Sequence, residues 1–319
     1  MEKEVVLDIK YLDKSYGSTT VLKNINMQCY AGEVFGFLGP NGAGKTTTIK
    51  IVAGLIKKDC GVVTVCGKDL KQDFEGALSC IGAIVENPEM YKYLSGLDNM
   101  KQYARMRGID DPRRLDEVIS MVGMSNRIKE KVSRYSLGMR QRLGVAQALL
   151  HQPKLLILDE PMNGLDPEGI YELRMILKRL AHENGICVVV SSHIMSEMEQ
   201  LCDRVGIISG GRMIGTYTVE ELIDQGKDTF CVYEFKVSDA GKAAQLCGLD
   251  EKHYDVNAEN DILLCSIKSD TEADTLADIN RRICAGGVKL YTVTPKSTKS
   301  LEDVFISLTH DSQGGGQIA

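Results

Sequence analysis

The sequence lacks long hydrophobic runs and an excess of basic residues. Nowhere in its 319 residues do about eighteen apolar residues follow one another, and the opening MEKEVVLDIK has no apolar stretch of signal-peptide length. We therefore expect a chain that neither enters nor spans a membrane by itself. The formal net charge of -6 and the pI near 5.5 also indicate no basic face for a polyanion, so no nucleic-acid partner is expected.

The ten cysteines show none of the spacings that bind metals. There is no CxxC pair and no Cys/His ligand pattern, and the two closest cysteines are Cys60 and Cys66. These absences argue against a zinc site and against a disulfide scaffold. They predict reduced, buried thiols in a cytosolic protein.

Residues from about 5 to 225 alternate between short β-branched runs and amphipathic helical patterns. Three predicted strands, 33–38, 155–158 and 186–190, are largely apolar, as expected of strands covered on both faces. Two segments carry apolar residues at the helical i, i+3, i+4, i+7 spacing: Ile49, Val52, Ala53 and Ile56, and Leu173, Ile176, Leu177 and Leu180. The alternation predicts an α/β layer fold.

Two parts of the chain depart from this alternation. Between about 87 and 150 strand signals fade and helix starts appear, at Ser95 and at Asp111 followed by Pro112, which predicts a helical subdomain. The first domain is expected to span 1–225. The order βαββαβ after it predicts a small α+β, ferredoxin-like accessory domain over 226–310, with a last helix over 300–309. A flexible tail is expected over 311–319.

Residues 39–48 read GPNGAGKTTT, and the stretch fits G-x-x-x-x-G-K-[ST] between a predicted strand and a predicted helix. Glycines allow consecutive backbone N–H groups to converge on phosphate oxygens, and the helix start adds its positive dipole end. Lys45 would neutralise the β and γ phosphates, and Thr46 would offer its hydroxyl to Mg²⁺. The predicted nucleotide contacts are Gly39, Asn41, Gly42, Gly44, Lys45, Thr46 and Thr47. The predicted cofactors are ATP and Mg²⁺.

The predicted strand LLIL is followed by two acidic residues, Asp159 and Glu160. Because side chains alternate along a strand, these carboxylates cannot point at the same spot. We assign Asp159 to the metal, through water, and Glu160 to the role of general base for the attacking water. Lys45 and Glu160 are predicted catalytic residues. At this point a small-molecule kinase fits these residues as well as an ATPase does.

Further motifs follow in a characteristic order. YSLGMRQRLGVAQALL precedes LLILDEPMNGLD, and a later strand leads into Ser191, Ser192 and His193. Together with the phosphate loop, they resemble the nucleotide-binding domain of ATP-binding cassette (ABC) transporters over about residues 5 to 225. The resemblance implies that His193 is a switch histidine and a further catalytic residue, and that Asp166 belongs to the D-loop. It also implies that Ser136 and Gly138 belong to the signature loop. Tyr16 would be the aromatic residue that stacks on adenine, although an aromatic residue near Tyr11 could also be core.

Two positions depart from the pattern of the family. The signature loop reads Tyr-Ser-Leu-Gly-Met in place of Leu-Ser-Gly-Gly-Gln, which keeps the Ser and the second Gly. Glu86 stands where the family usually has a glutamine that touches Mg²⁺, so Glu86 is predicted to be a metal ligand together with Thr46 and Asp159. The alternative is an exposed loop glutamate with no such role. Glu86 and YSLGMRQRL resemble the bacterial subgroup that exports bacitracin or protects lantibiotic producers.

The resemblance implies an ATP-binding subunit that dimerises head to tail, hydrolyses ATP and drives export of a peptide or drug through a separate membrane permease. The chain would be cytoplasmic and peripheral on the inner face of the bacterial membrane. Met90, Tyr91 and Tyr93 are candidate contacts to the permease, or else core residues of the helical subdomain. A soluble cassette ATPase acting on ribosomes or DNA is the alternative, although one phosphate loop and no sustained heptads argue against it.

Overall fold

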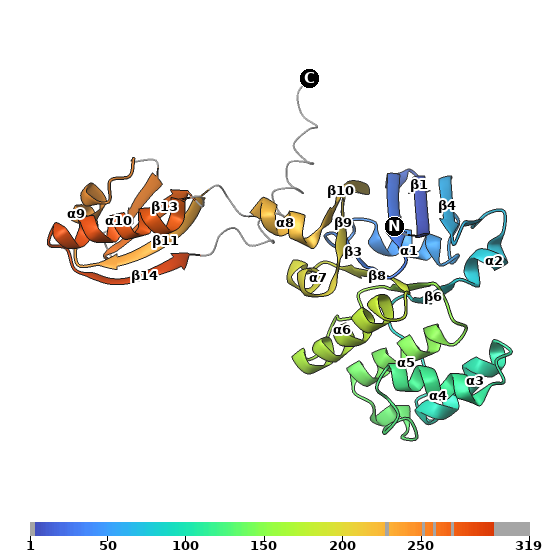
Figure 1. The fold of residues 1–319 in the computed structure, drawn as a ribbon. Coiled ribbons are helices and arrows are strands. Elements are labelled where there is room, and N and C mark those ends of the chain that lie inside the picture. The colour runs from blue at the N-terminus through green and yellow to red at the C-terminus, as the bar shows by residue number, and fades with distance from the viewer. Residues whose placement is uncertain (1–3, 227–229, 251–252, 258–259, 269–270, 297–319) are drawn as a thin grey trace. The chain divides into compact units, whose positions relative to one another are not determined.

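The computed structural model describes residues 4–226, 230–250, 253–257, 260–268 and 271–296 (Figure 1). The chain divides into two compact units, and the division falls between Val219 and Glu220, whereas the sequence analysis places it after residue 225. The predicted helix over 300–309 and tail over 311–319 lie outside the described residues. Within the described ranges, every helix is too short or too polar to cross a membrane.

A six-stranded sheet in the order β10-β9-β3-β8-β7-β6 forms the centre of the first unit. Its strands are β3 (Val34–Leu38), β6 (Ile81–Ile84), β7 (Leu155–Leu158), β8 (Cys187–Ser192), β9 (Arg204–Ser209) and β10 (Arg212–Thr218). Neighbouring strands are parallel except for β9 and β10. The three predicted strands are confirmed as β3, β7 and β8, each buried along its whole length, and the α/β prediction is confirmed with them.

A second, antiparallel sheet in the order β2-β1-β4-β5 belongs to the same unit. It consists of β1 (Val5–Tyr16), β2 (Thr19–Tyr30), β4 (Cys60–Val65) and β5 (Lys68–Asp69). The sequence analysis did not separate these strands from the parallel sheet. One hydrophobic cluster contains buried residues of both sheets and of helix α1 (Lys45–Val52), so they share a single core.

Strand β3 places helices on both of its faces. Phe35 and Phe37 are fully buried in the shared core. Gly36 lies between them and therefore faces the opposite side of the sheet. A Cβ atom at Gly36 would lie 2.8 Å from Cys202 Sγ and 2.9 Å from Met198 Sδ, so only glycine allows this close packing. Those residues lie in and just after helix α7 (Met195–Leu201), and helix α6 (Pro167–His182) also packs against β3 and β8.

The helical subdomain begins after β6 and contains helices whose caps are local in sequence. Ser95 accepts a hydrogen bond from the backbone N–H of Asp98, and Asp111 accepts one from Arg113, with Pro112 as first helical residue. The two predicted helix starts are therefore confirmed. The helices are α3 (Gly96–Met106), α4 (Pro112–Met121), the 3₁₀ turn η1 (Val132–Arg134) and α5 (Leu137–Leu149), while the short α2 (Phe74–Leu78) precedes β6.

The second unit has its own sheet and core. After α8 (Val219–Gly226), its elements run β11 (Phe230–Val237), α9 (Ala240–Leu246), β12 (Tyr254–Asn257), β13 (Ile262–Lys268), α10 (Glu272–Ala285) and β14 (Leu290–Lys296). The sheet order is β12-β13-β11-β14, and all neighbouring strands are antiparallel. This order has the topology of a split βαβ, ferredoxin-like fold. Its buried residues form a separate cluster around Phe235 and Ile283.

Candidate active site

The loop between β3 and α1 forms a small cavity at the start of a helix. Gly42 and Gly44 have φ angles of 81° and 112°, which glycine adopts readily. A Cβ atom at Gly39 would overlap the backbone oxygen of Ile208. The cavity has a volume of about 230 Å³ and is lined by Val21, Asn41, Gly42, Gly44, Lys45, Thr46, Thr47 and Glu160. Backbone N–H groups at a helix start and a lysine make this cavity suitable for phosphate groups.

Lys45 is the most buried charged group of the cavity. Its side chain is 5% exposed, and Nζ donates hydrogen bonds to the backbone oxygens of Gly39 at 2.7 Å and Pro40 at 3.3 Å. Nζ also lies 3.4 Å from Glu160 Oε1. The ammonium group is thus balanced by a carboxylate and two carbonyl groups, as a buried charge requires.

The two acidic residues after β7 have different partners, as their alternation along the chain predicts. Asp159 is buried, and its Oδ1 accepts a hydrogen bond from Ser191 Oγ at 2.6 Å. Glu160 has a positive φ of 49°, and its Oε2 lies 2.7 Å from His193 Nδ1. The Glu160 carboxylate therefore lies between Lys45 and His193, at the edge of the phosphate cavity.

Ser191 is a site residue whose contacts the sequence analysis missed. Besides donating to Asp159, Ser191 Oγ accepts a hydrogen bond from the backbone N–H of Glu160 at 2.9 Å. The following Ser192 accepts from the backbone of Ile194 at 3.0 Å, which stabilises the turn that carries His193. The only sequence signal was the position of two serines directly before His193.

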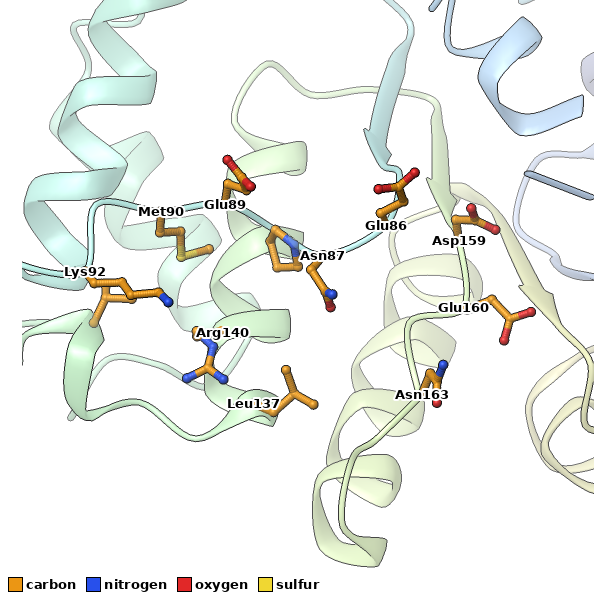
Figure 2. A pocket seen from close by; sticks show the side chains of 12 residues that line it. Glu86, Asn87, Glu89, Met90, Lys92, Leu137, Arg140, Asp159, Glu160 and Asn163 are labelled. Atoms are coloured by element: carbon orange, nitrogen blue, oxygen red, sulfur yellow. The ribbon is translucent and has the colours of Figure 1, made fainter. Parts of the chain in front are cut away.

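Glu86 follows β6 and, with Asp159 and Glu160, lines a larger cavity of about 740 Å³, in which Figure 2 shows Glu86 on the same side as Asp159. Its side chain is 70% exposed and pairs with Lys50 Nζ of α1 at 2.9 Å. This hydrogen bond is the main reason why the pKa of Lys50 is raised. Across the same cavity lie Leu137 and Arg140, which belong to the first turn of α5.

The remaining predicted residues do not line the phosphate cavity in the described part of the chain. Ser136 caps α5 and accepts a hydrogen bond from the N–H of Met139 at 3.2 Å, with Gly138 in the first turn. Asp166 caps α6 and accepts from Gly169 at 3.1 Å. Tyr16 ends β1 and is 50% exposed. One chain thus brings Lys45, Glu160 and His193 together, whereas Ser136 does not line the phosphate cavity.

Comparison with known proteins identifies the class of this site. The family model described as ABC transporter matches residues 22–163. The bacitracin transport ATP-binding protein BcrA of Bacillus licheniformis is 39% identical over 307 residues, covering 96% of this chain and 97% of that protein. The lantibiotic transport ATP-binding protein SrtF of Streptococcus pyogenes is 44% identical over 225 residues, covering 69% of this chain and 96% of that protein.

Solved structures lead to the same class. The structure of CbiO1 from Clostridium perfringens, part of the ABC transporter complex CbiONQ, covers 70% of this chain and 92% of its own, with a TM-score of 0.64 and 26% identity. The chain belongs to the ATP-binding proteins of ABC transporters, which bind and hydrolyse ATP to drive transport. This membership favours transport over action on ribosomes or DNA, and ATP hydrolysis over a small-molecule kinase.

Proposed function

We propose that two copies of the chain stack head to tail, with two ATP molecules between them. The observation that carries this proposal is the composition of the phosphate cavity, which is lined by Val21, by residues of the 41–47 segment and by Glu160 but not by Ser136 or Gly138. The start of α5 at Ser136 offers backbone N–H groups, a hydroxyl and a helix dipole to an anion. Each nucleotide would therefore contact Lys45 of one copy and Ser136 of the other, with Asp166 close to the interface.

In this arrangement Glu160 is the general base. Its carboxylate would take a proton from water as the water oxygen bonds to the γ-phosphorus and the bond to the leaving ADP oxygen breaks. A proton on His193 Nδ1, 2.7 Å from Glu160 Oε2, would orient the carboxylate, and a second proton on Nε2 would let the ring donate to a γ-phosphate oxygen. Lys45 would exchange its contact with Glu160 for the phosphate oxygens.

The residues also fit a magnesium ion, which would neutralise charge on the phosphates. Thr46 lines the cavity, and the carboxylate of Asp159, which directly precedes the cavity residue Glu160, is held by Ser191. Within the described residues no group of three or more acidic, His or Cys side chains forms a ready cage, which agrees with an ion held largely by phosphate and water. Glu86 would join this ion through a carboxylate whose Oε1 is paired with Lys50.

We further propose a permease partner and a position on the inner face of a bacterial membrane. A groove of about 450 Å³ between β6 and the helical subdomain is lined by Tyr103, Met106 and His151 together with the 87–89 loop. Met106 is 80% exposed, and Tyr91 and Tyr93 are 51% and 69% exposed, so the tyrosines are surface residues rather than core. Such apolar exposure fits a partner surface. By analogy with BcrA and SrtF, the cargo would be an antimicrobial peptide or drug.

The test is the Glu160→Gln variant, compared with Glu168→Gln at an exposed position on α6. The neutral amide keeps the shape of the side chain but cannot accept the proton, so ATP binding should persist while hydrolysis stops. Light scattering after gel filtration in Mg-ATP should find a stable dimer for Glu160→Gln but not for the control Glu168→Gln. A variant that stays monomeric in saturating Mg-ATP, with the permease present, contradicts the dimer, and rapid hydrolysis contradicts the base assignment.

A further inference from the structure

A lysine lies over the ring of Tyr16, the residue proposed to stack on adenine. Lys14 and Tyr16 are two positions apart in β1, so their side chains leave the strand on the same face. Lys14 Nζ lies 5.2 Å from the centre of the Tyr16 ring, within the range of a cation–π interaction. Tyr16 is 50% exposed while the side chain of Lys14 is 13% exposed, so the ammonium group lies over one face of a ring that is partly open to solvent.

Asp59 holds this lysine in place. Its Oδ1 accepts a hydrogen bond from Lys14 Nζ at 2.8 Å, and its Oδ2 accepts one from the backbone N–H of Ser15 at 2.6 Å. The backbone N–H of Asp59 donates to Asp13 at 3.1 Å. Both contacts to its carboxylate lower the pKa of Asp59. Since Asp59 directly precedes β4, these bonds tie the end of β1 to the segment that follows the phosphate-loop helix α1.

The position of Tyr16 fits a nucleotide bound at the phosphate loop. Tyr16 pairs with Thr19 of β2, and Val21, two positions further along that strand, lines the phosphate cavity. Tyr16 therefore lies at the end of the strand pair that reaches the predicted phosphate site.

We propose that Lys14 and Asp59 are positioning residues for the nucleotide base: Asp59 fixes the Lys14 ammonium on one face of Tyr16, so that adenine stacks on the opposite face. The proposal rests on the proposed contact of Tyr16 with adenine. A ring that is already held in one orientation loses less freedom on binding, so the preformed cluster favours ATP. Phosphate binding at Lys45 does not depend on this cluster.

The experiment compares the affinity of the full-length chain for Mg-ATP and for Mg-tripolyphosphate, which lacks base and ribose, by titration calorimetry. Lys14→Met and Asp59→Asn should each weaken ATP binding about two- to fivefold, the size expected for an exposed cation–π contact. Tripolyphosphate binding should not change. The two variants alter the net charge in opposite directions, so a common loss cannot come from long-range attraction to phosphate. Lys14→Arg keeps a cation at this position, so its ATP affinity should stay close to that of the unaltered chain.

Lys10→Met is the matched control. Lys10 lies on the same strand, and its Nζ pairs with Asp8 at 2.8 Å. The Lys10→Met variant should bind both ligands as the unaltered chain does. Equal losses for ATP and tripolyphosphate, or unchanged ATP affinity in Lys14→Met and Asp59→Asn, overturn the positioning role. Tyr16→Leu tests the adenine contact separately from the role of Lys14 and Asp59. Unchanged ATP affinity in Tyr16→Leu overturns the adenine contact itself, whereas a loss there alone overturns only the role of Lys14 and Asp59.

Discussion

Ser191 is the residue on which the arrangement of the two acidic residues most depends. Its hydroxyl donates to Asp159 Oδ1 at 2.6 Å and accepts from the backbone N–H of Glu160 at 2.9 Å. Ser191 is fully buried, and Asp159 is 6% exposed. The Ser191→Ala change removes both hydrogen bonds, because the methyl group offers neither a donor nor an acceptor.

The expected cost follows from these two bonds. A hydrogen bond to a charged group contributes about 1.5–3 kcal/mol and a neutral one about 0.5–1.5 kcal/mol, so Ser191→Ala should lower the free energy of unfolding by about 2–4.5 kcal/mol. The carboxylate of Asp159 would lose a donor, and the peptide that sets the direction of Glu160 would lose its anchor. ATP turnover should therefore fall about tenfold or more, since catalytic geometry is sensitive to shifts of about 1 Å.

Urea unfolding followed by circular dichroism, together with phosphate release from ATP, measures both effects. Ser209→Ala is the matched control, because Ser209 is also buried and its hydroxyl has no hydrogen-bond partner within the described structure. That variant should keep its stability within about 1 kcal/mol. Ser191→Thr, which keeps the hydroxyl, should lie closer to the unaltered chain. If Ser191→Ala matches Ser209→Ala in both assays, the hydroxyl does not organise the acidic pair.

Two further changes test Glu86 and His151. Glu86→Gln removes the charged partner that raises the pKa of Lys50, and we expect a changed Mg²⁺ dependence of ATP hydrolysis; a metal titration that superimposes on that of the unaltered chain would leave Glu86 as a surface residue. Burial, with a smaller contribution from Arg107, lowers the pKa of His151 in the folded chain from 6.5. Below pH 6.5 the unfolded chain therefore binds the proton more readily than the folded chain does. The free energy of unfolding should fall as the pH falls. His151→Gln, which can keep the hydrogen bond to Ile81 O, should lose less stability between about pH 7 and pH 5 in urea unfolding. An equal loss in both proteins would show that His151 does not cause it.

The sequence predicted those features that depend on near neighbours along the chain. The phosphate loop requires glycines and a lysine at set intervals before a helix, and the caps at Ser95 and Asp111 bond to residues two or three positions later. Whole-length burial of β3 and β7 was also predictable, because an apolar run of strand length leaves no polar face for water. The α/β class could also be predicted, because strand-like and helix-like segments alternate along the chain.

Tertiary structure alone decided which distant residues meet. Ser191 meets Asp159 because β7 and β8 are hydrogen-bonded neighbours, and Glu86 meets Lys50 although 36 residues separate them. The antiparallel sheet of β1, β2, β4 and β5 likewise depends on pairing between distant segments. The cluster of Asp59, Lys14 and Tyr16 follows from that pairing. The physical reason is that spacing along a chain determines local backbone hydrogen bonds, whereas the order and register of strands arise from the packing of the whole core.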